Sequence, residues 1–294
     1  MKVLVTGASG YIGSALLSSL PNARGAYRRL EAAPPGLDAV CIGELGPDAD
    51  WRAALDGVEA VVHLAGVAHR KASAEDYQRI NVSGTERLVR QAVEAGVRRF
   101  IFMSSIKATA DASTAPLSEL TPTHPADAYG RSKRDAEKIV LAEPSLNAVV
   151  LRPPLVFSAD AKANFAALLR LAATPWPLPI QNVRNLRSMI SREALVAALA
   201  SVLAKAGPTG VFHLSMNQPI STPDLVACLR EGMGQSARLF GLPATMLNRL
   251  LPAALRESLV VDDSAFRAAY DYGAADTDIR SALRATGAAW RQRS

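Results

Sequence analysis

The chain has 294 residues, of which 49% are hydrophobic and 20% charged, and its 33 Lys and Arg outnumber its 27 Asp and Glu to give a formal net charge of +6. This composition is typical of a globular protein and excludes a disordered chain, while the lack of 18 consecutive apolar residues and of a signal peptide predicts no membrane span and a cytoplasmic location. The modest basic charge suits an anionic small ligand, whereas no basic run with interleaved aromatic residues, as nucleic-acid binders carry, is present.

Short β-branched runs alternate with amphipathic stretches along the first half of the chain. Strands are predicted, in chain order, at Lys2–Val5, Gly25–Tyr27, Ala39–Ile42, Ala60–Leu64, Arg99–Met103, Ala148–Leu151 and Val211–Leu214. Helices are predicted at Ile12–Leu20, Trp51–Leu55, Asp76–Ala95, Tyr129–Leu141 and Ser191–Lys205. This alternation predicts an α/β fold, a Rossmann-like doubly wound parallel sheet with helices on both faces and ligands at the carboxyl ends of its strands.

After Phe157 the alternation weakens. Residues 158–190 contain Pro175, Pro177 and Pro179 and few strand signals, and residues 216–294 are mostly helical in pattern. We therefore expect two domains: an NAD(P)-binding Rossmann domain of residues 1–157 plus 191–215, and a smaller, mostly helical substrate-binding domain of residues 158–190 plus 216–294.

Cysteine and histidine usage gives no sign of a metal site. Cys41 and Cys228 stand in apolar surroundings and are predicted to be small core residues. There is no Cys-x-x-Cys motif, and the histidines are scattered, at His63, His69, His124 and His213. No metal is therefore expected.

A glycine-rich turn follows the first strand. Thr6-Gly7-Ala8-Ser9-Gly10-Tyr11-Ile12-Gly13 places Gly7 at a tight turn, Gly10 where the backbone must approach a pyrophosphate, and Gly13 where the helix must lie close to the sheet. The N-terminus of the helix that begins here would present free N–H groups to the phosphates. The pattern predicts a bound dinucleotide, with Tyr11 and Ile12 beside it.

The end of the second predicted strand indicates which dinucleotide is bound. An NAD-binding protein usually carries an acidic residue there, whereas this chain has Arg28 and Arg29, which could clamp a 2′-phosphate. This favours NADPH over NAD, with surface charge as the alternative explanation of the two arginines. Glu44 and Leu45, after the third strand, are expected beside the adenine.

A tyrosine and a lysine lie one helical turn apart at Tyr129 and Lys133, so they share a helix face. An ammonium near a phenol lowers its pKa, which makes the pair a candidate general acid and base. Ser105 ends the Ser104-Ser105 pair that follows the strand Arg99–Met103, at a carboxyl strand end where it could polarise a substrate carbonyl.

These motifs together resemble the extended short-chain dehydrogenase/reductases, in particular the nucleotide-sugar epimerase/dehydratase group. The resemblance covers essentially the whole chain and includes His63-Leu64-Ala65-Gly66, Asn81-Val82-Ser83-Gly84-Thr85, Ser104-Ser105, Tyr129–Lys133 and Arg152-Pro153-Pro154. It implies an NAD(P)-dependent enzyme with Ser105, Tyr129 and Lys133 as catalytic residues. Further cofactor contacts implied by the resemblance, besides the glycine-rich turn, are Leu64, Ala65, Gly66, Asn81, Pro153, Tyr129 and Lys133.

The same resemblance implies a UDP-sugar substrate. It places Asn164 near the nucleotide of the sugar donor and Arg187 at the diphosphate, with Arg256 as the candidate for a second diphosphate arginine. Ser105 and Tyr129 would contact the reacting carbon. Lys107, close to them, is either a substrate contact or a solvated charge.

The site disfavours dehydration, because Ile106-Lys107-Ala108 follows Ser105 where a 4,6-dehydratase carries a carboxylate pair. The motifs are most similar to bacterial reductases of UDP-4-keto-6-deoxy-N-acetylhexosamines, which supply UDP-N-acetylquinovosamine-type donors for surface polysaccharides. The predicted function is NADPH-dependent reduction of such a 4-keto group. Alternatives are an NAD-dependent UDP-hexose 4-epimerase and a non-catalytic NADP-binding regulator. Relatives often form homodimers through helices equivalent to residues 76–95 and 129–142.

Overall fold

The computed structural model describes residues 1–68, 72–216, 218–270, 272 and 278–293. Within them, seven parallel strands form one sheet in the order β3-β2-β1-β4-β5-β6-β9. Their bounds are β1 Val3–Thr6, β2 Arg24–Tyr27, β3 Ala39–Cys41, β4 Ala60–His63, β5 Arg99–Met103, β6 Val149–Arg152 and β9 Gly210–His213. The predicted Rossmann-like α/β fold is confirmed, and the order reverses between β1 and β4, where such sheets bind their ligands.

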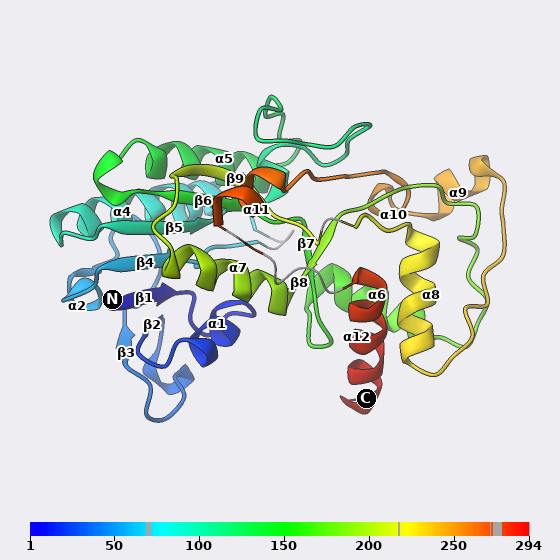
Figure 1. Ribbon diagram of the computed structural model, residues 1–294, viewed down its shortest axis with the longest axis horizontal. Helices are drawn as coiled ribbons and strands as arrows, with labels where there is room; N and C mark the ends of the chain where they lie inside the picture. The colour runs from blue at the N-terminus through cyan, green and yellow to red at the C-terminus, as the bar shows by residue number, and fades with distance from the viewer. Residues whose placement is uncertain (69–71, 217, 271, 273–277, 294) are drawn as a thin grey trace.

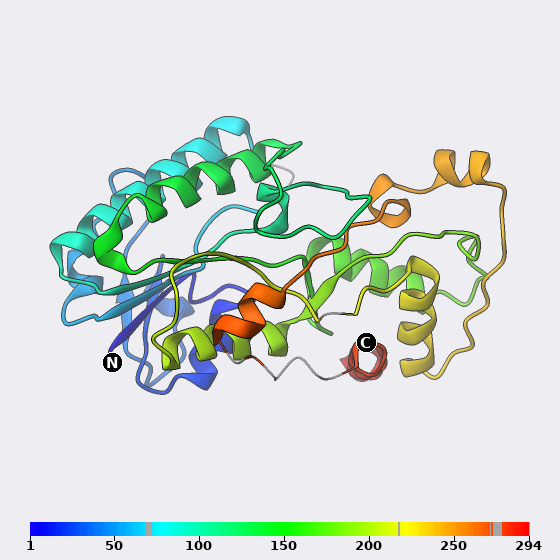
Figure 2. The ribbon, with the colours of Figure 1, turned by 45° about the horizontal axis from the view of Figure 1, so that its top comes forward.

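Helices cover both faces of this sheet. One face carries α2 (Arg52–Leu55), α4 (Gly84–Glu94) and α5 (Ala128–Leu141), and the other carries α1 (Gly13–Ser19) and α7 (Arg192–Ala204). In Figure 2 the cyan α4 and the green α5 lie side by side above the sheet, with α1 and α7 below it. The predicted helix over residues 76–95 is interrupted: α3 (Ala74–Asp76) leads through a π-helical turn, Tyr77–Ser83, into α4.

Alternating side chains explain why the sheet is buried on both faces. Leu4, Val61 and Phe100 point to the face of α4 and α5. Their strand neighbours Val5, Val62 and Ile101 point to the face of α1 and α7. Because successive strand residues face opposite ways, continuous apolar strands are needed to fill two cores, as the sequence pattern predicted.

A second lobe follows the sheet (Figure 1). It contains α6 (Ala163–Ala173), α8 (Thr222–Gly232), α9 (Ala244–Leu250), α10 (Ala253–Arg256) and α12 (Ile279–Arg293), while α11 (Ser264–Tyr270) packs against β9. A short parallel pair, β7 (Leu155–Phe157) with β8 (Met189–Ser191), joins the lobes. The sequence did not predict this pair, because three-residue strands are too short to show a period.

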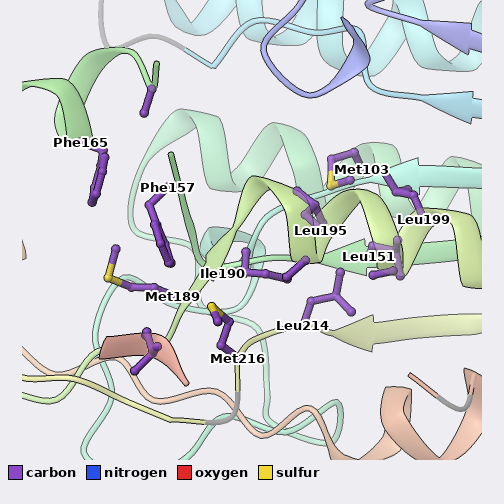
Figure 3. Close-up of a cluster of buried hydrophobic side chains, with 14 of the residues drawn as sticks. Met103, Leu151, Phe157, Phe165, Met189, Ile190, Leu195, Leu199, Leu214 and Met216 are labelled. Atoms are coloured by element: carbon purple, nitrogen blue, oxygen red, sulfur yellow. The ribbon is translucent and has the colours of Figure 1, made fainter. Parts of the chain in front are cut away.

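The apolar core runs without a break from the sheet into the second lobe. Figure 3 shows Leu151 and Leu195 on the sheet side, Met189 and Ile190 of β8 between, and Phe165 of α6 beyond. All five side chains are buried. The two lobes therefore share one core and are not joined by a linker alone.

One predicted core residue is wrongly placed. Cys41 ends β3, which lies at the edge of the sheet, and its side chain is exposed, with its Sγ 3.3 Å from the Arg28 carbonyl. An edge strand has one side open to solvent, so an apolar sequence environment there does not imply burial. Cys228, on α8, is buried as predicted. Of the histidines, His69 lies outside the described residues.

Candidate active site

The glycine-rich turn between β1 and α1 has the close backbone packing that its three glycines require. Gly7 adopts φ +67°, and a Cβ on Gly13 would lie 2.2 Å from the Gly7 carbonyl oxygen. No side chain caps the first turn of α1, while the Gly10 and Ser14 N–H groups donate to the Gly7 and Gly10 carbonyls at 2.8 and 3.0 Å. A narrow cradle of backbone N–H groups fits a pyrophosphate, and these residues therefore fit a dinucleotide.

The loop after β4 is tied to this turn by Thr6. The Thr6 hydroxyl accepts hydrogen bonds from the N–H groups of Leu64 and Ala65, both at 3.1 Å, and lies 2.7 Å from His63 Nδ1. Burial, followed by the charge of Lys133, lowers the pKa of His63 to about 3, so the ring is neutral. The N–H groups of Leu64 and Ala65 are therefore used in hydrogen bonds within the protein. Gly66, the next residue of this loop, is exposed.

Asn81, a predicted cofactor contact, forms hydrogen bonds within the protein. Its amide accepts from the Val67 N–H at 2.8 Å and donates to the Val67 carbonyl at 2.9 Å and to Ser132 Oγ at 3.1 Å. The side chain is buried. Asn81 thus clamps the loop after β4 to helix α5, and both its polar atoms are used within the protein.

The residues predicted to select the cofactor surround a hollow of about 250 Å³ lined by Ser9, Arg28, Arg29, Ala32 and Glu44. It opens beside the glycine-rich turn, after β2. Arg28 and Glu44 are exposed and lie 3.9 Å apart, so their ion pair is loose and Arg28 is free to turn toward a ligand.

Leu45 and Ile12 are half-buried and pack against the two cores.

Ser105, Tyr129 and Lys133 meet at the carboxyl end of β5. Tyr129, in the first turn of α5, lies close enough to Ser105 for that hydroxyl to act on its pKa, while Lys133 Nζ donates to the Met103 carbonyl at 2.9 Å. Burial raises the pKa of Tyr129 to about 12 and lowers that of Lys133 to about 8. The prediction that Lys133 depresses the pKa of Tyr129 is therefore wrong in this geometry, because burial raises that pKa and the opposing effect comes from Ser105.

A buried ion pair gives Ser104 a different role from that of Ser105. Glu137, on α5, accepts a short hydrogen bond from Ser104 Oγ and pairs with Arg152 at the end of β6, at 2.9 Å from Nε and 2.5 Å from Nη2. Arg152 also donates to Thr109 at 3.0 Å. The Ser104 hydroxyl therefore forms its hydrogen bond with the buried Glu137, and Ser105 is the hydroxyl that faces Tyr129.

Backbone contacts fix the segment that follows Ser105. The Pro153 carbonyl is buried and accepts the Ile106 N–H at 2.9 Å, so this predicted cofactor contact supports the short 3-10 turn Ile106–Ala108. Lys107, within that turn, places Nζ 2.6 Å from both Asp111 and Asp127. Lys107 is therefore neither a free substrate cation nor a solvated charge.

The residues predicted to contact the UDP part of the substrate lie toward the second lobe. Arg187 is half-buried before β8, donates from Nη1 to the Glu257 carbonyl at 3.0 Å, and lies close enough for the Asp111 charge to act on it. Asn164 is exposed in the first turn of α6. Arg256 donates to Asn248 at 2.7 Å.

A polar cluster that the sequence did not reveal joins the glycine-rich turn to the second lobe. Tyr11, predicted to contact the cofactor, donates its hydroxyl to Ser158 at 2.6 Å, and Arg192 stacks 5.0 Å from its ring centre. Arg192 also pairs with Asp160 at 2.6 Å. The partners are about 150 to 180 residues from Tyr11, so no local pattern could have identified them.

Residues 1–68, 72–216, 218–270, 272 and 278–293 include no helix long and apolar enough to cross a membrane. Over the same part of the chain, no three His, Cys, Asp or Glu side chains are grouped as metal ligands would be.

An all-parallel sheet of this order, with a glycine-rich turn and a Tyr-x-x-x-Lys helix, defines the class of extended short-chain dehydrogenase/reductases. The sequence model of the NAD dependent epimerase/dehydratase family matches residues 3–214. The chain therefore belongs to this family.

Individual relatives carry several activities. The chain is 32% identical to a UDP-glucose 4-epimerase of Vibrio cholerae, over 76% of this chain and 74% of the relative. It is 29% identical to a 4-hydroxy-2-methyl-3-oxo-4-farnesyl-3,4-dihydroquinoline-1-oxide ketoreductase of Stigmatella aurantiaca, over 83% and 76% of the two chains. A UDP-glucuronic acid 4-epimerase from Bacillus cereus, crystallised with NAD, shares the fold with a TM-score of 0.82 at 19% identity, covering 100% and 99% of the two chains.

Proposed function

We propose that the protein reduces the C4 keto group of a UDP-4-keto-6-deoxy-N-acetylhexosamine with NADPH. The observation that carries this proposal is that Ser105, Tyr129 and the buried Lys133 meet at the carboxyl end of β5. A proton donor so placed suits a carbonyl oxygen that becomes an alkoxide. The similarity to a ketoreductase supports reduction as the reaction.

The chain's own residues account for the proton in this reaction. Ser105 and Tyr129 hydrogen-bond the C4 carbonyl oxygen and orient the sugar. A bound NADPH supplies the hydride that forms the new C4–H bond. The Tyr129 O–H bond breaks as the sugar O4–H bond forms, which leaves a phenolate that the ammonium of Lys133 stabilises until solvent returns a proton. Arg187 holds the diphosphate from the second lobe.

NAD-dependent 4-epimerisation of a UDP-hexose is the second candidate, favoured by the similarity to the Vibrio cholerae enzyme. It uses the same Ser105, Tyr129 and Lys133. Incubation with UDP-4-keto sugars and UDP-hexoses, each with NADPH and with NADH, separates the two. Loss of reduced-nicotinamide absorbance with a 4-keto sugar supports reduction. Conversion of a UDP-hexose without net change in absorbance, together with NAD retained on the purified protein, contradicts it.

Replacing both Arg28 and Arg29 by Ala is expected to raise the KM for NADPH by about 10- to 100-fold while changing the KM for NADH by less than about threefold. The reason is the loss of two charge-assisted contacts to the 2′-phosphate. The measurement is initial rate against cofactor concentration. Arg52→Ala is the matched control, because Arg52 is also exposed and paired only with the nearby Asp50. Equal effects on the KM for NADPH and for NADH would show that the two arginines do not contact the 2′-phosphate.

The two neighbouring serines give a second comparison. Ser105→Ala is expected to lower kcat by about 10- to 100-fold with little change in melting temperature, because it removes a hydrogen bond at the reacting oxygen. Ser104→Ala is expected to lower the melting temperature, because Glu137 loses a buried donor. Steady-state kinetics and thermal unfolding of both variants test this. A reversed pattern would assign the active hydroxyl to Ser104.

A further inference from the structure

Lys107 is held by two carboxylates at the edge of the candidate active site. Its Nζ lies 2.6 Å from Asp127 Oδ2 and 2.6 Å from Asp111 Oδ1, and the three side chains are between 31% and 45% exposed. Its backbone N–H donates to Ser105 Oγ at 3.2 Å. The residue therefore touches the active hydroxyl through its main chain and an ion-pair cluster through its side chain.

Asp127 links this cluster to the helix that carries Tyr129. It is the N-cap of α5, and its Oδ1 accepts the Gly130 N–H at 2.7 Å while its Oδ2 binds Lys107. Gly130 packs directly on the Lys107 main chain, since a Cβ there would lie 2.3 Å from the Lys107 carbonyl oxygen. The first turn of α5 thus rests on Lys107 both through Asp127 and through backbone contact.

The charges in this cluster act on Tyr129. The Asp127 carboxylate adds to the effect of burial in raising the pKa of Tyr129, whereas the nearby Ser105 hydroxyl opposes it. Burial alone would lower the pKa of Lys107, but its bonds to Asp111 and Asp127 raise that pKa above its ordinary value, so the ammonium stays charged. An unpaired Asp127 would therefore oppose the phenolate more strongly.

We propose that Lys107 is a positioning residue, which neutralises Asp127 while Asp127 caps α5, and so keeps the Tyr129 hydroxyl against Ser105 and able to release its proton. This proposal rests on the proposed role of Tyr129 in proton transfer. Lys107 acts on the Tyr129 phenol through Asp127, while its main-chain N–H contacts Ser105 Oγ. The same cluster explains why the turn after Ser105 carries a cation where a dehydratase would need carboxylates.

Other charged or titratable groups also face this region and must be held constant in a test. They come from four elements, namely Tyr77 from the π-helical turn, Arg131 and Lys133 from α5, Asp111 from the loop after Ile106–Ala108, and Arg187 from the segment before β8. None of them is changed in the variants below.

The test compares Lys107→Met, Lys107→Arg, Asp127→Asn and the double variant Lys107→Met with Asp127→Asn. Lys107→Met is expected to lower kcat about tenfold and to move the pH profile of kcat to higher pH by about one unit, because a nearby unpaired carboxylate opposes the phenolate. Asp127→Asn moves the profile to lower pH, and the double variant moves it back toward wild type. Lys107→Arg keeps the charge and is expected to stay within about threefold of wild type.

Lys138→Met is the matched control, since Lys138 is on the same helix, is 70% exposed and pairs with Asp135 at 3.5 Å, away from Tyr129. It is expected to leave kcat and the pH profile unchanged. The Tyr129 pKa is also read without any sugar, as the phenolate absorbance of each protein minus that of its Tyr129→Phe counterpart, with oxidised cofactor bound. Melting temperatures confirm that each variant folds.

The two readouts separate the outcomes. A higher Tyr129 pKa in Lys107→Met and a lower one in Asp127→Asn support the proposal. An unchanged Tyr129 pKa overturns it, even if activity falls, because Lys107 would then act on the substrate directly. If wild type turns over none of the UDP-sugars, the proposed function fails, while the absorbance titration still decides the role of Lys107.

Discussion

Tyr129→Phe is expected to lower kcat by about 10²- to 10⁴-fold, the usual contribution of a general acid. The change removes one oxygen from a half-buried ring and leaves the helix cap at Asp127 and the ring contact with Tyr77, 5.8 Å between centroids, in place. Loss of activity should therefore reflect lost proton transfer and not lost structure. The measurement is single-turnover oxidation of NADPH with a UDP-4-keto sugar.

Cofactor binding provides the control for this variant. Because the glycine-rich turn is untouched, Tyr129→Phe should bind NADPH within about threefold of wild type, measured by the fluorescence of the reduced nicotinamide. A rate within tenfold of wild type would remove Tyr129 from the chemistry. Loss of both binding and activity would indicate a distorted site instead.

Glu137→Gln is expected to lower the free energy of unfolding by about 3–5 kcal/mol, because it leaves the buried Arg152 guanidinium without its counter-charge. The two side chains are 3% and 6% exposed, and the pair spans the gap between α5 and the end of β6. Urea unfolding followed by circular dichroism measures the change. The double variant Glu137→Leu with Arg152→Met, which removes both charges, should be less destabilised than Glu137→Gln.

A surface ion pair provides the control that separates the effect of burial from that of charge on the free energy of unfolding. Glu231 and Arg284 lie 2.6 Å apart, but both side chains are nearly half exposed. Glu231→Gln should therefore shift the urea midpoint far less than Glu137→Gln. Similar shifts in the two variants would contradict a special role for the buried pair.

Most of the sheet was predictable from local pattern, and the exceptions have clear causes. Parallel strands buried on both faces must be apolar throughout, so β4 and β5 appear as continuous runs that any window detects. By contrast, β7 and β8 have three residues each and are joined across more than 30 residues of chain. Cys41 was misplaced because sequence pattern does not show which strand forms the edge of a sheet.

The candidate site, too, was predictable only in the parts that depend on local spacing. Spacing within one helix placed Tyr129 and Lys133 on one face, and the glycine positions predicted the turn after β1. The pKa of Tyr129 was mispredicted, because the net effect of burial and of Asp127 depends on what packs around the ring. Nothing local to Asn81 indicated that both its polar atoms would be used within the protein.

Local spacing was enough to predict the seven strands of the main sheet, the glycine-rich turn and the shared helix face of Tyr129 and Lys133, because each depends on residues close together in the chain. Only the tertiary structure decided which serine faces Tyr129, that Lys107 is held between Asp111 and Asp127, and that Arg192 reaches the ring of Tyr11. Those contacts join residues far apart in the chain. Their electrostatic effects are set by burial and by distance, which become defined only when the chain is folded.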